Sequence, residues 1–166
     1  MTRQQLFARL DALGIRHVTT THDPVFTVAE SEQLERSLPG GHTKNLFLKD
    51  AKGRLFLIIA ESRTAVDLKA LHRAIGCGRL SFGRAGLLAE ALGVQPGSVT
   101  AFAVANDTAG RVSVVVDAKL MGYDSINCHP LENTATTNIS RDDLMRFIRA
   151  TGHEPRVIEL ASAPRA

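Results

Sequence analysis

The chain has no tryptophan, one tyrosine and two cysteines among its 166 residues. With seven phenylalanines as the other aromatic residues, we do not expect a single-strand nucleic-acid binder that stacks many bases on a row of rings. The two cysteines, Cys77 and Cys128, are too few for a disulfide framework or a zinc ribbon. No apolar run reaches the length of about 18 residues that a membrane span needs, and the N-terminus predicts an amphipathic helix rather than a signal peptide. We therefore expect a cytoplasmic protein with no membrane partner.

Charge is nearly balanced, with 20 Lys and Arg against 17 Asp and Glu, a formal net charge of +3 with His neutral. This balance is compatible with contact to a phosphate backbone but does not require it. A length of 166 residues with 44% hydrophobic residues suffices for one well-packed core. With no repeat, linker or low-complexity block in the sequence, we expect a single domain over residues 1–166.

Hydrophobic periodicity and capping residues predict five helices, and short apolar runs between turn residues predict the strands. The helices are expected at 4–13, from Thr27 to the stop at Pro39, from the cap at Asp67 to Ile75, and at 83–92 and 141–151, with a helical turn at 118–121. The strands are expected at 15–21, 42–48, 55–60, 101–105, 112–116, 123–126 and 157–160.

The segment 55–59 is apolar at every position, which is typical of a central strand covered on both faces. Residues 42–48 and 55–60 should form a hairpin around the turn-forming residues 49–54. Helices and strands do not alternate strictly, which disfavours a doubly wound parallel sheet. The pattern predicts an α/β (α+β) sandwich in which helices flank a mixed β-sheet.

The segment 127–138 is polar, carries one charge and is rich in Asn, His and Thr beside a proline that fixes the backbone. Such a composition suits recognition of a polar ligand. A strand-turn-strand hairpin, in which the threonines simply favour strands, explains it equally well.

Sequence motifs for covalent, metal or cofactor chemistry are missing. Cys128 and His129 are adjacent, and neighbouring side chains on a strand point to opposite faces, so we expect that they do not share one pocket and that Cys128 is a buried free cysteine. The six histidines show no HExxH spacing, and there is no GxSxG elbow or P-loop. We expect neither a metal site nor a cofactor.

Lys44 precedes the apolar run 46–48 and follows two glycines. A lysine that enters a buried strand is costly unless its charge is paired or reaches solvent. It either snorkels at a strand end or places a cation at the mouth of a cleft, where it would meet a phosphate or carboxylate.

Three separated segments together resemble the YbaK/prolyl-tRNA-synthetase-associated editing superfamily, in particular its freestanding ProX-type alanyl-tRNA(Pro) deacylases. They are GHTKNLFLKD at 41–50, LGVQPGSVT at 92–100 and NCHPLENTATT at 127–137. Their order and spacing match across roughly residues 3–160. One departure is at 100–102, where this chain has Thr-Ala-Phe and many relatives carry a proline.

The resemblance implies hydrolysis of the ester that joins a wrong amino acid to the 3′-terminal adenosine of tRNA, without metal or covalent nucleophile. It assigns Lys44, Asn45 and His129 to catalysis, with Lys44 at the nucleotide end. The substrate-binding residues that it implies are Gly97, Ser98, Val99, Pro130, Asn133 and Thr136. Backbone N–H groups around Gly97 to Val99 are the expected oxyanion donors.

Ala-tRNA(Pro) is the substrate expected first, selected by a tight pocket that admits alanine and excludes proline. Cys-tRNA(Pro), as in YbaK-type proteins, and a noncatalytic module that binds tRNA or a nucleotide are the alternatives. The implied partner is the acceptor end of tRNA, in particular tRNA(Pro), with prolyl-tRNA synthetase or translation factors as further candidates. The basic residues that would contact the acceptor stem are Arg63, Lys69, Arg73, Arg79 and Arg84, although a solvated helix face also explains them.

Overall fold

The computed structural model describes residues 1–25 and 27–160. The helices are α1 (Arg3–Ala12), α2 (Val28–Ser37), α3 (Leu68–Ile75), α4 (Ala85–Leu92) and α5 (Arg141–Ala150), with 3₁₀ turns η1 (Ala101–Asn106) and η2 (Ala118–Gly122). The strands are β1 (His17–Thr21), β2 (Gly41–Asp50), β3 (Leu55–Glu61), β4 (Leu80–Phe82), β5 (Val112–Asp117), β6 (Ser125–Cys128), β7 (Ala135–Ser140) and β8 (Arg156–Ile158). None of the helices in this part of the chain is long and apolar enough to span a membrane.

The strands form one mixed sheet in the order β1-β7-β6-β2-β3-β5-β8, with β4 added to β2. The pairs β1–β7, β6–β7, β2–β3 and β2–β4 are antiparallel, whereas β2–β6, β3–β5 and β5–β8 are parallel. The ten-residue strand β2 joins the two halves of the sheet, because it pairs with β6 at its start and with β3 and β4 further along. The predicted mixed sheet flanked by helices is confirmed.

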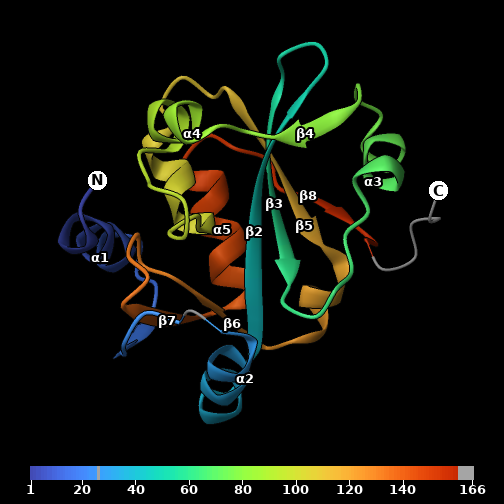
Figure 1. Cartoon of the computed structure of the whole chain (residues 1–166). Coiled ribbons are helices and arrows are strands. Elements are labelled where there is room, and N and C mark those ends of the chain that lie inside the picture. The colour runs from blue at the N-terminus through green and yellow to red at the C-terminus, as the bar shows by residue number, and fades with distance from the viewer. Residues whose placement is uncertain (26, 161–166) are drawn as a thin grey trace.

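Each face of the sheet has its own apolar core. In Figure 1, α1, α4 and α5 lie on one side of β2 and α3 lies on the other. Alternating strand residues separate the cores: Phe47 and Leu57 face the first, and Leu48 and Ile58 face the second. This explains why 55–59 is apolar at every position, since all of β3 is buried between the two helical layers.

The expected strand at 101–105 is wrong, because these residues form the 3₁₀ turn η1. The Thr100 hydroxyl accepts a hydrogen bond from the Phe102 N–H (3.4 Å), and the Asp107 N–H bonds the Val104 carbonyl, which closes the turn. Residues 101–105 are all buried, and a short buried apolar run reads alike whether it is strand or helix. The short strand β4 was not expected either.

Residues 127–138 are a hairpin, so the hairpin alternative describes their backbone correctly. Strand β6 runs antiparallel to β7 with Cys128 opposite Thr137. Leu131 in the turn has φ 68°, a left-handed conformation that is uncommon outside glycine. The polar side chains of this hairpin do not all face solvent, and several of them surround a cavity.

Candidate functional site

A cavity of about 80 Å³ lies between helix α2 and the start of β2, where β6 and β7 meet it. Figure 1 shows α2 at this end of β2, beside β6 and β7. The lining residues from the sheet are His42, Thr43, Asn127, Cys128, His129 and Thr136, and those from the other side are Val25, Ser31, Leu34 and Glu35. The cavity therefore joins segments from the first and third sequence motifs.

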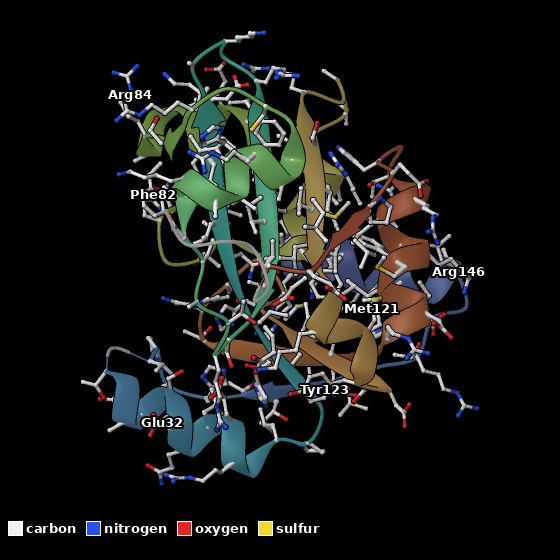
Figure 2. The ribbon with its side chains drawn as sticks, turned by 90° about the vertical axis from the view of Figure 1, so that its right-hand side faces the viewer. Glu32, Phe82, Arg84, Met121, Tyr123 and Arg146 are labelled. Atoms are coloured by element: carbon white, nitrogen blue, oxygen red, sulfur yellow. The ribbon has the colours of Figure 1, made fainter. Side chains whose placement is uncertain are left out.

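Helix α2 covers the cavity with one stripe of its surface. The Thr27 hydroxyl accepts a hydrogen bond from the Glu30 N–H (3.1 Å) and starts the helix as an N-cap. Ser31, Leu34 and Glu35 are spaced i, i+3 and i+4, so they share one face, and all three are partly buried. Glu32 lies on the exposed part of the helix (Figure 2).

His129 presents a neutral imidazole to this cavity. Its Nδ1 lies 3.0 Å from the Ala135 carbonyl oxygen, which can only accept, so Nδ1 carries the proton and Nε2 keeps its lone pair. Burial lowers the pKa of His129, an effect that the Ala135 contact opposes and the nearby His22 ring reinforces. The side chain is therefore a hydrogen-bond acceptor at neutral pH.

A second histidine, His22, holds the lining residue Thr136 in place. The His22 Nδ1 lies 2.7 Å from the Asp23 carbonyl oxygen, and its Nε2 lies 2.8 Å from the Thr136 hydroxyl. The carbonyl makes Nδ1 the donor, so in the neutral ring Nε2 accepts the Thr136 O–H. The rings of His22 and His129 are 6.3 Å apart.

Cys128 and His129 both line the cavity, so the expectation that they point to different pockets is wrong. Strand β6 ends at Cys128, and the strict alternation of a strand does not extend to His129. Cys128 is nevertheless buried, as expected for a free cysteine. Burial raises the pKa of its thiol to about 12, against a smaller opposing effect of the Thr43 hydroxyl, so it is no thiolate nucleophile at neutral pH.

Strand β2 has an open edge beside the cavity. On the side away from β3, strand β6 pairs with Gly41 and His42, and β4 pairs with 48–50. Residues 43–46 have no strand neighbour on that side within the described chain, and the Phe47 carbonyl already accepts from the Gly83 N–H (2.9 Å). A ligand laid across this edge can contact side chains from both faces of β2.

Lys44 and Asn45 lie on this edge but on opposite faces of the strand. Asn45 shares the face of Thr43 and Phe47, and Lys44 shares the other. The Asn45 Oδ1 is buried with no hydrogen-bond partner among the described residues, and the Lys44 ammonium has no ion pair or hydrogen bond there. The Lys44 ammonium is therefore available to a ligand, whereas Asn45 Oδ1 is a buried acceptor without a partner.

The loop 95–99 contributes no lining residue to the cavity, but the hydroxyl of the next residue, Thr100, donates to the His129 carbonyl oxygen (2.6 Å). Pro96 and Gly97 form a tight turn closed by the Ser98 N–H and the Gln95 carbonyl (3.0 Å), and Gly97 has φ 91°, the position where such a turn requires glycine. The Ser98 N–H is thereby engaged, so the expected oxyanion donors narrow to Gly97 and Val99.

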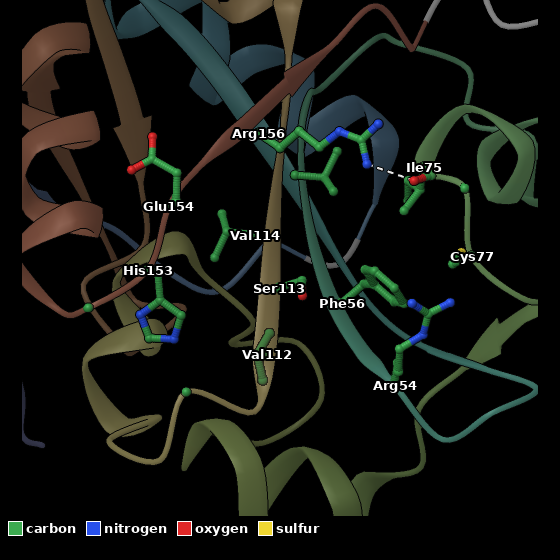
Figure 3. Close-up of a pocket in the computed structure, with 14 residues that line it drawn as sticks. Arg54, Phe56, Ile75, Cys77, Val112, Ser113, Val114, His153, Glu154 and Arg156 are labelled. Carbon is green, nitrogen blue, oxygen red and sulfur yellow. Dashed lines mark hydrogen bonds between the residues drawn. The ribbon is translucent and has the colours of Figure 1, made fainter.

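A larger hollow of about 430 Å³ lies over β5 and contains none of the expected site residues (Figure 3). Its two arginines lie on either side of Phe56 and are already bonded. Arg156 donates to the Ile75 carbonyl oxygen (2.6 Å) and Arg54 to the Asp50 carboxylate (3.0 Å). The small cavity, where the sequence motifs meet, is the better candidate.

Comparison with known proteins identifies the family of the chain. A family model described as an aminoacyl-tRNA editing domain matches residues 22–147. The prolyl-tRNA editing protein ProX of Acetoanaerobium sticklandii is 38% identical over 159 residues, covering 95% of this chain and 97% of that protein. The chain belongs to the aminoacyl-tRNA editing domain family.

Two further relatives extend this assignment. The prolyl-tRNA synthetase associated domain-containing protein 1 of Danio rerio is 39% identical over 158 residues, which are 94% of this chain and 86% of that protein. A solved structure of a candidate trans-editing enzyme for prolyl tRNA synthetase matches with a TM-score of 0.68 at 18% identity, over 93% and 94% of the two chains. That likeness concerns the fold. The predicted family, fold class and enzyme class, an aminoacyl-tRNA editing enzyme, are confirmed.

The residues predicted for this editing domain fall into three groups. His129 and Thr136 line the cavity, and Pro130 is buried next to them. Lys44 and Asn45 directly follow the lining residue Thr43 on β2. The loop 97–99 directly precedes Thr100, which is bonded to the His129 backbone. Asn133 is in the hairpin turn and does not line the cavity.

Sequence reasoning missed several lining residues of the editing domain, chiefly Thr43, Asn127 and Glu35. Thr43 could have been found, because it lies two positions from Asn45 on the same strand face. The Asn127 amide donates to the Pro39 and Gly41 carbonyl oxygens (2.9 and 3.2 Å) and ties the hairpin to β2. Glu35 carried no local signal, because only tertiary packing sets α2 over the sheet. Among the described residues of the editing domain, no three His, Cys, Asp or Glu side chains are grouped to hold a metal ion.

Proposed function

We propose that this editing domain acts in trans in the cytoplasm and hydrolyses Ala-tRNA(Pro) by direct attack of water on the aminoacyl ester. The observation that carries the proposal is the small cavity, which is lined by the His129 ring and by Thr43, the residue before Lys44 and Asn45 on the open edge of β2. An aminoacyl ester is already activated, so positioning a water molecule and stabilising an oxyanion suffice.

We assign each group a role in this reaction. The lone pair on His129 Nε2 accepts a hydrogen bond from the attacking water, while the Ala135 carbonyl holds the ring in the required tautomer. Lys44 contacts the phosphate of the terminal nucleotide from the other face of β2. The N–H groups of Gly97 and Val99 are the proposed oxyanion donors, and the neighbouring ribose hydroxyl of the substrate helps to orient the water.

Selectivity follows from size. A pocket of about 80 Å³ suits a small acyl group, and a pocket excludes a larger residue by overlap more effectively than it rejects a smaller one. A freestanding editor must spare correctly charged Pro-tRNA(Pro). Alanine, smaller than the proline ring, is therefore the error that this mechanism can remove.

A deacylation panel tests the proposal. Ala-, Cys- and Pro-tRNA(Pro) are each incubated with the enzyme under single-turnover conditions, and the expected order of rates is alanyl first, with prolyl near the spontaneous rate. Faster cleavage of Cys-tRNA(Pro) would make it a YbaK-type enzyme. Binding of tRNA with no hydrolysis of any ester would make it a noncatalytic module, and similar rates on alanyl and prolyl esters would refute the size argument.

A further inference from the structure

One carboxylate lines the small cavity and has no role in the mechanism above. Glu35 lies on the inner stripe of α2 and is partly buried. Within residues 1–25 and 27–160 it has no hydrogen bond or ion pair, and the other lining residues include no lysine or arginine. Partial burial without a partner is unfavourable for a carboxylate, so the site is suited to a cation.

The neutral polar groups on the sheet side of the cavity favour the same kind of ligand, because the donors of Thr43, Asn127, Thr136 and His42 Nε2 are already engaged. The Thr43 hydroxyl donates to the Asn127 carbonyl oxygen (2.8 Å), and the Asn127 amide donates to two other carbonyls. The Thr136 hydroxyl donates to His22, and the His42 Nε2–H donates to the Leu38 carbonyl oxygen (2.9 Å).

What remains unengaged is a set of acceptors. The two threonine oxygens keep lone pairs and Glu35 contributes a charged carboxylate, while the lone pair on His129 Nε2 serves the attacking water. An anion or a carbonyl group would meet the Glu35 carboxylate and find only the Ser31 hydroxyl and the Cys128 thiol as donors. A primary ammonium group has three N–H donors, one positive charge and no acceptor, which matches this lining.

We propose that the cavity beneath α2 is the subsite for the α-ammonium group of the aminoacyl ester, with Glu35 as its counter-ion. This inference rests on the proposed function, and it makes Glu35 a residue that determines specificity for the kind of acyl group. The enzyme then requires a free, charged α-amino group, and hydrolyses poorly any ester that lacks one.

The test compares two esters of equal size on the same tRNA(Pro). Alanyl-tRNA carries the ammonium, and lactyl-tRNA carries a neutral hydroxyl in its place. Each single-turnover rate is divided by the spontaneous hydrolysis rate of the same ester, because the ammonium itself activates the ester. For the wild-type protein we expect the normalised rate for alanyl to exceed that for lactyl by about 10- to 100-fold, the range for a charge-assisted contact.

Two variants of α2 test whether Glu35 causes the preference for the alanyl ester over the lactyl ester. Glu35→Gln should reduce the alanyl rate by about the same factor and leave the lactyl rate unchanged. Glu32→Gln, on the exposed face of the same helix, should change neither (Figure 2). A thermal melt checks that both variants are folded, and Glu35→Asp, which keeps the charge, should recover part of the alanyl rate.

The outcomes separate the two proposals. Equal normalised rates on both esters for the wild type would overturn the ammonium subsite while leaving the proposed hydrolysis intact. A loss on both esters in folded Glu35→Gln would also overturn it, because Glu35 would then act only on the structure of the site. Failure of the wild type to cleave either ester would refute the proposed function itself.

Discussion

His129 and His153 are both largely withdrawn from solvent, yet they serve different ends. His153 is 6% exposed, and both of its nitrogens are bonded, Nδ1 to the Thr151 hydroxyl and Nε2 to the Asp107 carboxylate, each at 2.8 Å. His129 has one bonded nitrogen and lies in the lining of a cavity. A histidine whose two ring nitrogens are both hydrogen-bonded stabilises the fold. A histidine with one unbonded nitrogen can take part in catalysis.

The Asp107 carboxylate beside His153 is likewise fully hydrogen-bonded. Burial on its own would raise the pKa of Asp107, but hydrogen bonds from His153, the Val112 N–H and the Arg111 N–H outweigh it and hold the pKa below its ordinary value. This cluster joins the segment after α5 to the start of β5. At the editing site no described cation compensates Glu35 in this way.

The largest expected effect is that of His129→Ala on catalysis. Loss of the acceptor for the attacking water should slow hydrolysis of Ala-tRNA(Pro) about 100-fold, the lower range for an acid–base group. The enlarged pocket should also narrow the ratio of alanyl to prolyl rates. Single-turnover rates on both esters measure this, and a near wild-type rate would remove His129 from the mechanism.

His153→Ala should give the opposite profile. Removing the ring leaves the buried Asp107 carboxylate short of a donor and opens a void, which should lower the free energy of unfolding by about 3 kcal/mol. Urea unfolding measures it. Glu154→Ala is the matched control, because its exposed pair with Arg149 should contribute less than about 1 kcal/mol. If His153→Ala were as stable as the wild type, His153 would have no structural role to distinguish it from His129.

Lys44→Ala tests the other unpartnered group at the site. Loss of one charge-assisted contact to the nucleotide should cost about 1.5–3 kcal/mol of transition-state stabilisation, with an unchanged thermal melt because the ammonium has no partner in the described chain. The exposed Lys52→Ala serves as the control. A wild-type rate for Lys44→Ala would place the lysine outside the site and favour the snorkelling interpretation.

The pH dependence should separate the two clusters. The pKa of His129 is lowered from its ordinary value of 6.5, so the active neutral ring persists through pH 7 and the hydrolysis rate should fall only below pH 6.5. The pKa of Asp107 is lowered from 3.8, so its contribution to stability is present above that value and is lost as the pH falls through the lowered pKa.

Rates and unfolding curves between pH 3 and pH 8 check both expectations. His22, His42 and Glu35 also lie at or beside the cavity, so the profile of His129→Gln is the control. If that variant keeps the same decline in rate below pH 6.5, the decline does not come from His129.

Cys128→Ser should have the smallest effect on the rate, about threefold or less. A thiol with a pKa of about 12 takes no part as a nucleophile at neutral pH. Cys128→Ala, which buries no hydroxyl, serves as a second variant, so that a folding defect of Cys128→Ser is not mistaken for a catalytic one. A loss of about a thousandfold in a folded variant would revive covalent catalysis by Cys128.

Local sequence signals located most elements correctly. The caps Thr27, Asp67 and Ser140 begin α2, α3 and α5 as expected, because an N-cap is a contact between residues two or three positions apart. The uniform hydrophobicity of β3 predicted its burial on both faces. The prediction of a strand at 101–105 failed, because burial on all sides removes the periodicity that distinguishes a strand from a helical turn.

The sequence by itself determined the family, the mixed sheet and the presence of His129 and Lys44 in matched segments, because motif order and periodicity are properties of the chain. Only the tertiary structure decided that α2 covers the site and that Glu35 lines the cavity. The tautomers of His22 and His129 are also set by the structure, through the carbonyl oxygens of Asp23, which follows β1, and of Ala135 in β7. These features depend on contacts between residues as many as 114 positions apart, as in the His22–Thr136 pair, and no local pattern encodes which groups such contacts leave free.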